Sequence, residues 1–163
     1  MKSTAHLKLA VEYNLWANKK IAEVLLQTTA SELNKEIVSS FSSIRKTVYH
    51  IWDAEFIWLS RINGVSLSSF PSKDFGDDIA IDSFLSCSED WLKSTANQED
   101  AFFDKVCTYK NLKQVEFSNT YAEIILHCMN HSTYHRGQLI TLLRQAGKVD
   151  LPSTDMIAFF REK

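Results

Sequence analysis

The sequence contains few of the residues that interrupt helices. Glycine occurs 4 times and proline 2 times in 163 residues. Folds made only of strands need frequent turns, and turns favour these two residues, so their scarcity argues against a turn-rich all-β fold and predicts long helices. A hydrophobic content of 45% supplies enough apolar side chains for a core. We expect one domain over residues 1–163.

Long runs of one chemical character are also lacking. There is no block of lysine and arginine and the net charge is -2, so a nucleic-acid role has no electrostatic basis. Polar residues interrupt every apolar run well before membrane-spanning length, so we expect no membrane span. The stretch MKSTAHLKLAVEYN is amphipathic rather than continuously apolar, so we expect no secretory signal.

Cysteine is rare as well. Cys87, Cys107 and Cys128 are odd in number, widely spaced and without a CxxC pair. This usage is typical of a cytoplasmic protein with reduced thiols, and it predicts three small buried side chains rather than a disulfide framework.

Apolar residues recur at helical spacing in four long segments. We expect these helices over residues 5–26, from 41 or 42 to 62, over 81–96, and from 120 to 145 or 146. Asn63-Gly64 and Gly147 are stop signals, and Thr120 with Glu123 forms a capping box. Four long helices predict an all-α protein, a four-helix bundle.

Shorter elements are expected between and after the long helices. Ser31 is the predicted N-cap of a short helix, and another short helix follows Pro152. The segment 65–78 contains serine, proline and glycine and predicts a loop. Between the third and fourth long helices, two runs rich in β-branched and aromatic residues flank KNLK, which predicts a small hairpin.

The stretch LHCMNHSTYHRGQ carries His127, His131 and His135 at four-residue spacing. On a helical wheel, His131 lies about 20° from Ile124 and Leu142, so it faces the bundle interior, where such folds build metal sites. Histidines four residues apart can share one ion, whereas His127 and His135 are about 12 Å apart and cannot. The ligand pair is therefore 127/131 or 131/135, and spacing does not decide between them.

A further ligand has to come from another helix. His6 lies near the terminus, where we expect it to be exposed, whereas His50 lies within the second long helix. Two histidines from one helix and one from another make a three-histidine site with an open position, which suits a catalytic metal such as Zn, Ni, Fe or Cu. The alternative is a polar seam of histidines that bind no metal.

Four stretches of the chain, in order, resemble the DinB-like family of metal-binding four-helix bundles, also called YfiT-like metal-dependent hydrolases. They are YNLWANKKI, SIRKTVYHIWDAEFIWLSRING, NHSTYHRGQL and LPSTDMIAFF. The third resembles the most specific motif of the family, His-x3-His-Arg-Gly-Gln. The fourth places Asp155 at the family's acidic position.

The resemblance implies that His50, His131 and His135 are the metal ligands. It leaves His127 as a neighbour, either on the substrate side or as a buried histidine bonded to a backbone carbonyl. Gln138 is a candidate to hold a ligand or a bound water by hydrogen bonding. Asp53 and Glu55 are candidates to support the ligands or to act as a general base, and are alternatively ordinary helix charges. Cys128 is a candidate fourth ligand or an inert buried thiol.

Three further residues of the motif have interpretations of their own. Tyr134 stands where many relatives carry a second histidine; it points about 100° away from His135, so ligation is unaffected. Arg136 points away from His131 and is expected in a salt bridge or an interface. Gly137 in mid-helix costs about 1 kcal/mol relative to alanine, which the close approach of another helix or chain would explain.

The resemblance implies a metal-dependent enzyme with a small-molecule substrate. A three-histidine metal activates water for hydrolysis or a low-molecular-weight thiol for S-transfer, and relatives that use bacillithiol or mycothiol favour the thiol. The resemblance also implies a homodimer. The alternative function is a non-catalytic, stress-associated metal-binding bundle.

Overall fold

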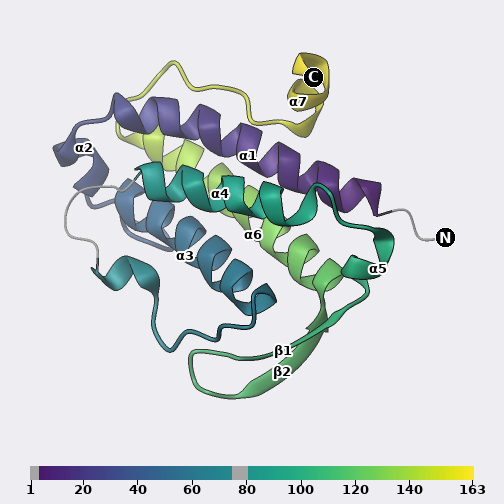
Figure 1. Ribbon diagram of the computed structural model, residues 1–163. Helices are drawn as coiled ribbons and strands as arrows, with labels where there is room; N and C mark the ends of the chain where they lie inside the picture. The colour runs from purple at the N-terminus through teal and green to yellow at the C-terminus, as the bar shows by residue number, and fades with distance from the viewer. Residues whose placement is uncertain (1–3, 75–80) are drawn as a thin grey trace.

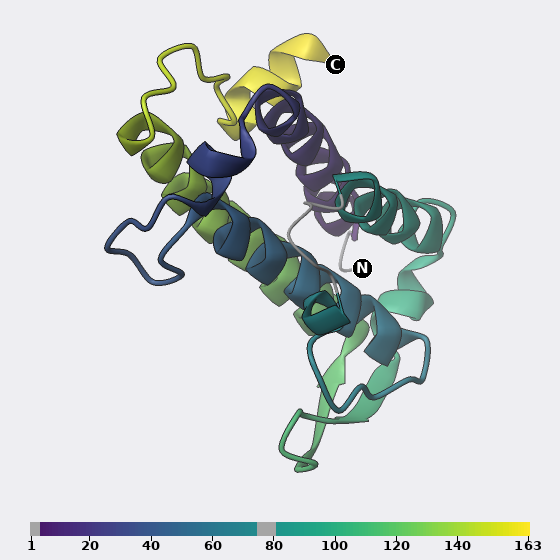
Figure 2. The ribbon, with the colours of Figure 1, turned by 90° about the vertical axis from the view of Figure 1, so that its left-hand side faces the viewer.

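Four long helices form the body of the protein, and a computed structural model describes residues 4–74 and 81–163 (Figure 1). The long helices are α1 (Ala5–Leu26), α3 (Ile44–Ile62), α4 (Ile81–Thr95) and α6 (Tyr121–Gln145). Both α1 and α3 pack against α4 and α6, so the four helices surround a common core. Figure 2 shows α3 and α6 running side by side over most of their length. The predicted all-α bundle is confirmed.

Shorter elements fill the connections between these helices. They are α2 (Ala30–Asn34), the 3₁₀ helix η1 (Pro71–Asp74), α5 (Asp100–Phe103), the strands β1 (Val106–Lys110) and β2 (Glu116–Thr120), and α7 (Met156–Glu162). The predicted loop 65–78 thus contains a helical turn, and its residues 75–78 lie outside the described part of the chain.

The start of α2 differs from the prediction. Thr29, not Ser31, is the N-cap, because its side chain accepts a hydrogen bond from the backbone N–H of Glu32. The Glu32 carboxylate accepts in return from the backbone N–H of Thr29, which completes a capping box. A Thr-x-x-Glu pair satisfies two orphan donors, whereas Ser31 has no matching acidic partner three residues later.

The predicted hairpin is present and leads directly into α6. Its strands are antiparallel, with Val106 opposite Thr120 and Lys110 opposite Glu116. Thr120 is both the last residue of β2 and the N-cap of α6, where it forms the predicted capping box with Glu123. The hairpin therefore fixes the point at which the histidine-bearing helix begins.

Both predicted stop signals end their helices. Gly64 follows α3 with φ 82° and Gly147 follows α6 with φ 101°. These left-handed conformations cost glycine little, so the chain can turn out of the helix while its last carbonyls stay bonded.

Large aromatic side chains fill the space between the helices. Trp91, Phe84 and Phe103 are almost fully buried, and the indole N–H of Trp91 donates to the backbone oxygen of Glu55 at 3.0 Å. A buried tryptophan stabilises the fold through its area only if its N–H is bonded, and here that bond also ties α4 to α3.

The C-terminal helix α7 lies against α1, as Figure 2 shows. Phe159 is buried there, with its ring 6.0 Å from that of Tyr13 and 5.7 Å from that of Trp16. Met156, Ile157 and Phe160 on the same helix remain exposed. Among the described residues, no helix is both long enough and apolar enough to cross a membrane.

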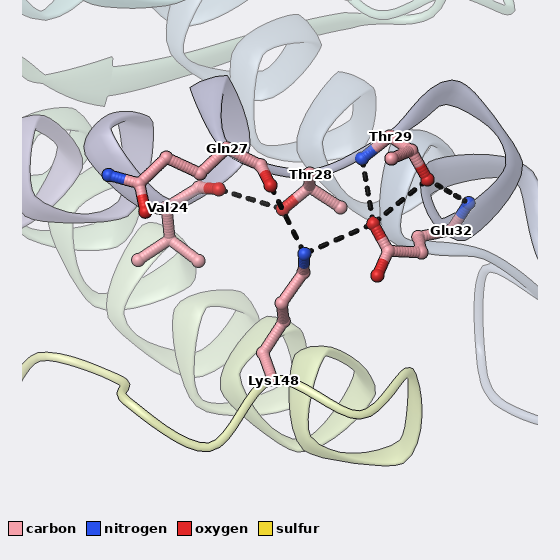
Figure 3. Close-up of polar contacts among 6 residues, drawn as sticks. All are labelled: Val24, Gln27, Thr28, Thr29, Glu32 and Lys148. Atoms are coloured by element: carbon pink, nitrogen blue, oxygen red, sulfur yellow. Dashed lines mark hydrogen bonds and ion pairs between the residues drawn. The ribbon is translucent and has the colours of Figure 1, made fainter.

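Lys148 joins the segment after α6 to the corner between α1 and α2 (Figure 3). Its ammonium donates to the backbone oxygen of Gln27 at 3.1 Å and to Glu32 Oε2 at 3.0 Å. The same carboxylate oxygen accepts from the backbone and the hydroxyl of Thr29. Hydrogen bonds from Thr29 and then Lys148 lower the pKa of Glu32 to about 2.

This lowered pKa makes the corner sensitive to acid. The pKa in the folded protein lies below the ordinary glutamate value of 4.5, so the ionised carboxylate stabilises the fold above about pH 4.5, and this contribution is lost as pH falls towards 2. We expect Glu32→Gln to lower the free energy of unfolding at pH 7, and the difference from the wild type to shrink at pH 3, as measured by urea titration. Glu36→Gln, at an exposed site nearby, is the control; an equal effect of both variants at both pH values would contradict the assignment.

Candidate metal centre

The ring nitrogens of three histidines converge between α3 and α6. His50 Nε2 lies 2.9 Å from His131 Nε2 and 3.1 Å from His135 Nε2. One ligand atom from each residue lies within 4.8 Å of the others. His131 and His135 lie on successive turns of α6, and His50 faces them from α3. The structure therefore brings together the pair 131/135 with the histidine of the second long helix.

This donor set fits a transition metal. Nitrogens bound at about 2.0 Å to one tetrahedral ion are separated by about 3.3 Å, close to the spacing seen here. Hydrogen bonding alone does not account for the cluster, because one imidazole nitrogen carries at most one proton and His50 Nε2 faces two other nitrogens. Three neutral imidazoles favour Zn, Ni or Fe over Mg or Ca.

Burial keeps two of the rings in the form that binds metals. It lowers the pKa of His50 to about 4 and that of His131 to about 3, with neighbouring histidines adding to the effect. Both rings are therefore neutral at pH 7, with a lone pair available for a ligand bond.

Gln138 orients one of the three rings. Its Oε1 lies 2.8 Å from His135 Nδ1. A carbonyl oxygen only accepts, so His135 Nδ1 carries the proton and Nε2 presents its lone pair to the cluster. Gln138 follows His135 by three residues on α6, which places it on the same face.

Phe41 covers the cluster from the connection between α2 and α3. Its ring stacks on His50 at 4.0 Å between centroids and meets His135 edge-on at 5.4 Å. Ser42, the next residue, has φ 42°, an uncommon conformation for a residue other than glycine. This turn carries Phe41 over the histidines before α3 begins.

Asp53 and Glu55 have partners other than the three histidines. Asp53 accepts from the backbone N–H and hydroxyl of Ser72, at 2.8 and 2.6 Å, and so ties η1 to α3. Burial raises the pKa of Asp53, against the lowering effect of these bonds. Among the hydrogen bonds of the described residues, neither carboxylate reaches His50, His131 or His135.

Glu55 instead lies at the centre of a polar network inside the bundle. Its carboxylate accepts from the side chains of Asn14 and Asn18 on α1, Ser88 on α4 and Ser132 on α6. All five residues are buried. Four donors on three other helices satisfy the oxygens of this carboxylate, which is the condition for burying a charge at tolerable cost.

Arg136 supplies the opposite charge to this network. Its guanidinium donates to the side-chain oxygens of Asn14 and Asn18, and to Thr133 Oγ1 at 2.8 Å. It is 1% exposed, and burial lowers its pKa. The expected salt bridge or interface is thus replaced by an internal bridge, in which two asparagines connect the guanidinium to Glu55.

The structure distinguishes between the alternatives for three other residues of the motif. His127 is exposed and stacks edge-on against Trp58 at 5.2 Å, so the buried, carbonyl-bonded alternative is wrong. Cys128 is fully buried, which raises its pKa, and it is not part of the convergent group found among the described residues. A methyl group added at Gly137 would meet nothing within 4 Å among the described residues, so none of the described helices approaches closely enough to require that glycine.

Several residues around the cluster were not singled out from the sequence. The burial of Asn14 and Asn18 could have been predicted from the sequence, because they continue the helical spacing of Val11, Ile21 and Leu25, which are buried. Polar residues in such a stripe need buried partners. The contacts of Phe41 and Ser72 could not have been predicted in this way. Both residues lie in connections between the long helices, and the path of a connection depends on the tertiary structure.

Fold and site together define a class: a four-helix bundle with a three-histidine cluster between two of its helices. The family model described as the DinB family matches residues 1–161, and the chain belongs to the DinB family.

Two relatives agree with this assignment. The chain is 29% identical over 161 residues to Protein DinB of Bacillus subtilis (strain 168), covering 93% of this chain and 92% of that protein. It also resembles the crystal structure of a DinB-like protein from Bacillus cereus ATCC 10987, with a TM-score of 0.63 and 17% identity. That match covers 87% of this chain and 91% of the other, and at this identity it supports the fold alone.

The internal network predicts a large effect of removing its cation. Arg136→Met leaves the asparagine oxygens without donors and Glu55 without a compensating charge, so we expect a loss of about 3 kcal/mol in the free energy of unfolding. Urea titration measures it, with Arg144→Met, an exposed arginine of the same helix, as the control. A loss no larger than that of the control would contradict the role given to Arg136.

Proposed function

We propose that this protein is a metal-dependent enzyme that uses His50, His131 and His135 as ligands and activates a low-molecular-weight thiol. The convergence of three ring nitrogens carries the proposal, with the Nε2 atoms of His131 and His135 both within 3.1 Å of His50 Nε2. Three protein ligands leave a coordination position for a substrate atom, whereas structural zinc is normally closed by four. When bound, a divalent Zn, Ni or Fe ion supplies a Lewis acid that lowers the pKa of a thiol or water in that position.

The surroundings of the cluster favour a thiol over water as the nucleophile. Hydrolysis is helped by a general base and acid near the reacting atoms, commonly a carboxylate. Both candidate carboxylates have other partners: Asp53 binds Ser72, and Glu55 binds the internal network. A thiol needs less help, because its unperturbed pKa of about 8.5 is already near neutrality.

The proposed reaction is an S-transfer. The thiol gives its proton to solvent, and the resulting thiolate sulfur forms a bond to an electrophilic carbon of the second substrate. The bond from that carbon to the leaving group breaks, and the leaving group departs with the electron pair. Gln138 contributes by holding the His135 ring, and Phe41 by covering one side of the cluster.

Pockets adjoin the residues around the cluster on both sides along α6. One, of about 220 Å³, is lined by Phe41, Thr47, Gln138 and Leu142 among others, and carries no charged side chain. The other, of about 380 Å³, includes His127. The first pocket lies beside Gln138 and Phe41, which contact the ligand histidines, and space of its size suits a small substrate better than a metal with a purely structural role.

The ligand assignment predicts the metal content of the purified protein. We expect about one transition-metal ion per chain in untagged, unchelated protein, and its loss in His50→Ala, His131→Ala and His135→Ala, because two imidazoles bind far more weakly than three. Elemental analysis measures this. His6→Ala removes an exposed histidine outside the cluster and should keep the ion. No metal in the wild type, and no uptake of added zinc or nickel, would refute the site.

Gln138 provides a finer test of the same centre. Gln138→Ala removes the acceptor that orients His135, and we expect metal affinity to fall about 10–100-fold while saturating metal still gives the wild-type stoichiometry. Gln138→Glu keeps an acceptor oxygen and should restore most of the affinity. Competition with a chromophoric chelator measures both, with Asn130→Ala, exposed on the same helix, as the control. Unchanged affinity in Gln138→Ala would contradict the role.

A further inference from the structure

The third histidine of the motif has no role in the proposed metal centre. His127 lies one turn before His131, with 6.0 Å between ring centroids. Its ring packs edge-on against Trp58 and is exposed. Within the described part of the chain, neither of its ring nitrogens has a hydrogen-bond partner. An imidazole held in place by an aromatic neighbour, with both nitrogens free, is available to a ligand.

His127 forms part of the wall of a pocket of about 380 Å³. The wall residues are Trp58, Tyr109, Asn119, Glu123, Ile124 and His127. They come from α3, both strands of the hairpin and α6. His127 is four residues, about 6 Å along α6, from His131, and Glu123 is eight residues, about 12 Å, from it. A molecule whose reactive atom is at the cluster therefore needs a chain of about 12 Å to bring its other end to Glu123.

The charge of the wall indicates which group it accepts. Glu123 is its one carboxylate, and the wall contains no lysine or arginine. The hydrogen bond from the backbone of Thr120 lowers the pKa of Glu123, so the carboxylate is ionised at neutral pH. Trp58 and Tyr109 supply an apolar surface for the carbon chain of a ligand.

An opposing charge lies behind the wall. The guanidinium of Arg61 stacks on the rings of Trp58 at 4.3 Å and Tyr109 at 4.6 Å, and Arg61 is 7% exposed. It is not among the wall residues, so a ligand in the pocket meets Glu123 directly and Arg61 only across an aromatic ring. Since the Coulomb energy falls with distance, the carboxylate has the larger effect.

We propose that this pocket binds a primary ammonium group of the thiol substrate, with Glu123 and His127 accepting its hydrogen bonds. The proposal rests on the proposed thiol activation and adds the chemical class of the substrate: an aminothiol. An ammonium has three donors and no acceptor, which matches a wall that offers a carboxylate and an imidazole lone pair. Together, an exposed ion pair and contact with aromatic rings supply about a tenfold preference.

Three alkanethiols of equal chain length, ending in an amine, a hydroxyl or a carboxylate, test this preference. Each is titrated into cobalt-loaded protein at pH 7, and its dissociation constant is taken from the thiol-dependent change in the cobalt absorption spectrum. We expect the amine to bind about tenfold more tightly than the hydroxyl, and the carboxylate most weakly. Equal binding of the amine and the hydroxyl would overturn the inference, and tightest binding of the carboxylate would assign the pocket to Arg61 and overturn it too.

Two variants connect the preference to the wall. Glu123→Gln keeps the capping box, which accepts glutamine, but removes the charge; His127→Ala removes the imidazole. In each variant, we expect the preference for the amine over the hydroxyl to fall severalfold, with cobalt content unchanged. Glu23→Gln, an exposed carboxylate on α1, should leave the ratio as in the wild type. If both Glu123→Gln and His127→Ala keep the wild-type preference for the amine over the hydroxyl, the inference is overturned.

Failure of the proposed function gives a different result. If cobalt binds and none of the three thiols changes its spectrum, thiol activation is refuted and the aminothiol assignment falls with it. If the hydroxyl thiol binds and the amine has no advantage, thiol activation stands and only the role of the pocket is refuted.

Discussion

The arrangement of the bundle depends on the buried carboxylate of Glu55. It accepts hydrogen bonds from α1, α4 and α6 while belonging to α3, so one group touches all four long helices. Hydrogen bonds are directional, unlike apolar contacts, and a shift of one helical turn, about 5.4 Å, would break them. Ser132, one of the donors, is adjacent to His131 in the chain. The bonds that fix the register of α3 against α6 therefore also place His50 opposite His131 and His135.

Burying the charges of this network costs free energy, and the hydrogen bonds among its residues offset that cost. An isolated buried carboxylate would take a proton or destabilise the fold by several kcal/mol. Here Asn14 and Asn18 donate to Glu55 and accept from Arg136, so two neutral amides connect two charges that do not need to touch. The guanidinium extends from a face of α6 that lies about 100° from His135 and about 140° from His131. One helix thus presents a structural face and a face for chemistry.

Much of this could be predicted from periodicity and spacing. The limits of the long helices, the capping box at Thr120 and the inward face of His131 follow from local rules that the folded chain obeys. Spacing left two histidine pairs open; the family resemblance favoured 131/135, and this is the pair that lies against His50 in the structure. The partners of Asp53 and the position of Phe41 depend on connections, where the path of the chain is set by tertiary contacts rather than by sequence pattern. The exposed state of His127 depends in the same way on a neighbouring helix and hairpin.

His50 and His131 are 81 positions apart in the chain, and they approach within 2.9 Å. A single ion held between them would close a loop containing half of the sequence, as a cross-link does. Holding these two residues together costs the unfolded chain entropy, and this cost grows slowly with loop length. The unfolded chain would therefore bind the ion far more weakly than the folded chain does, so the ion would stabilise the folded state. The amount of folded protein in a cell would then follow the supply of the ion as well as the temperature.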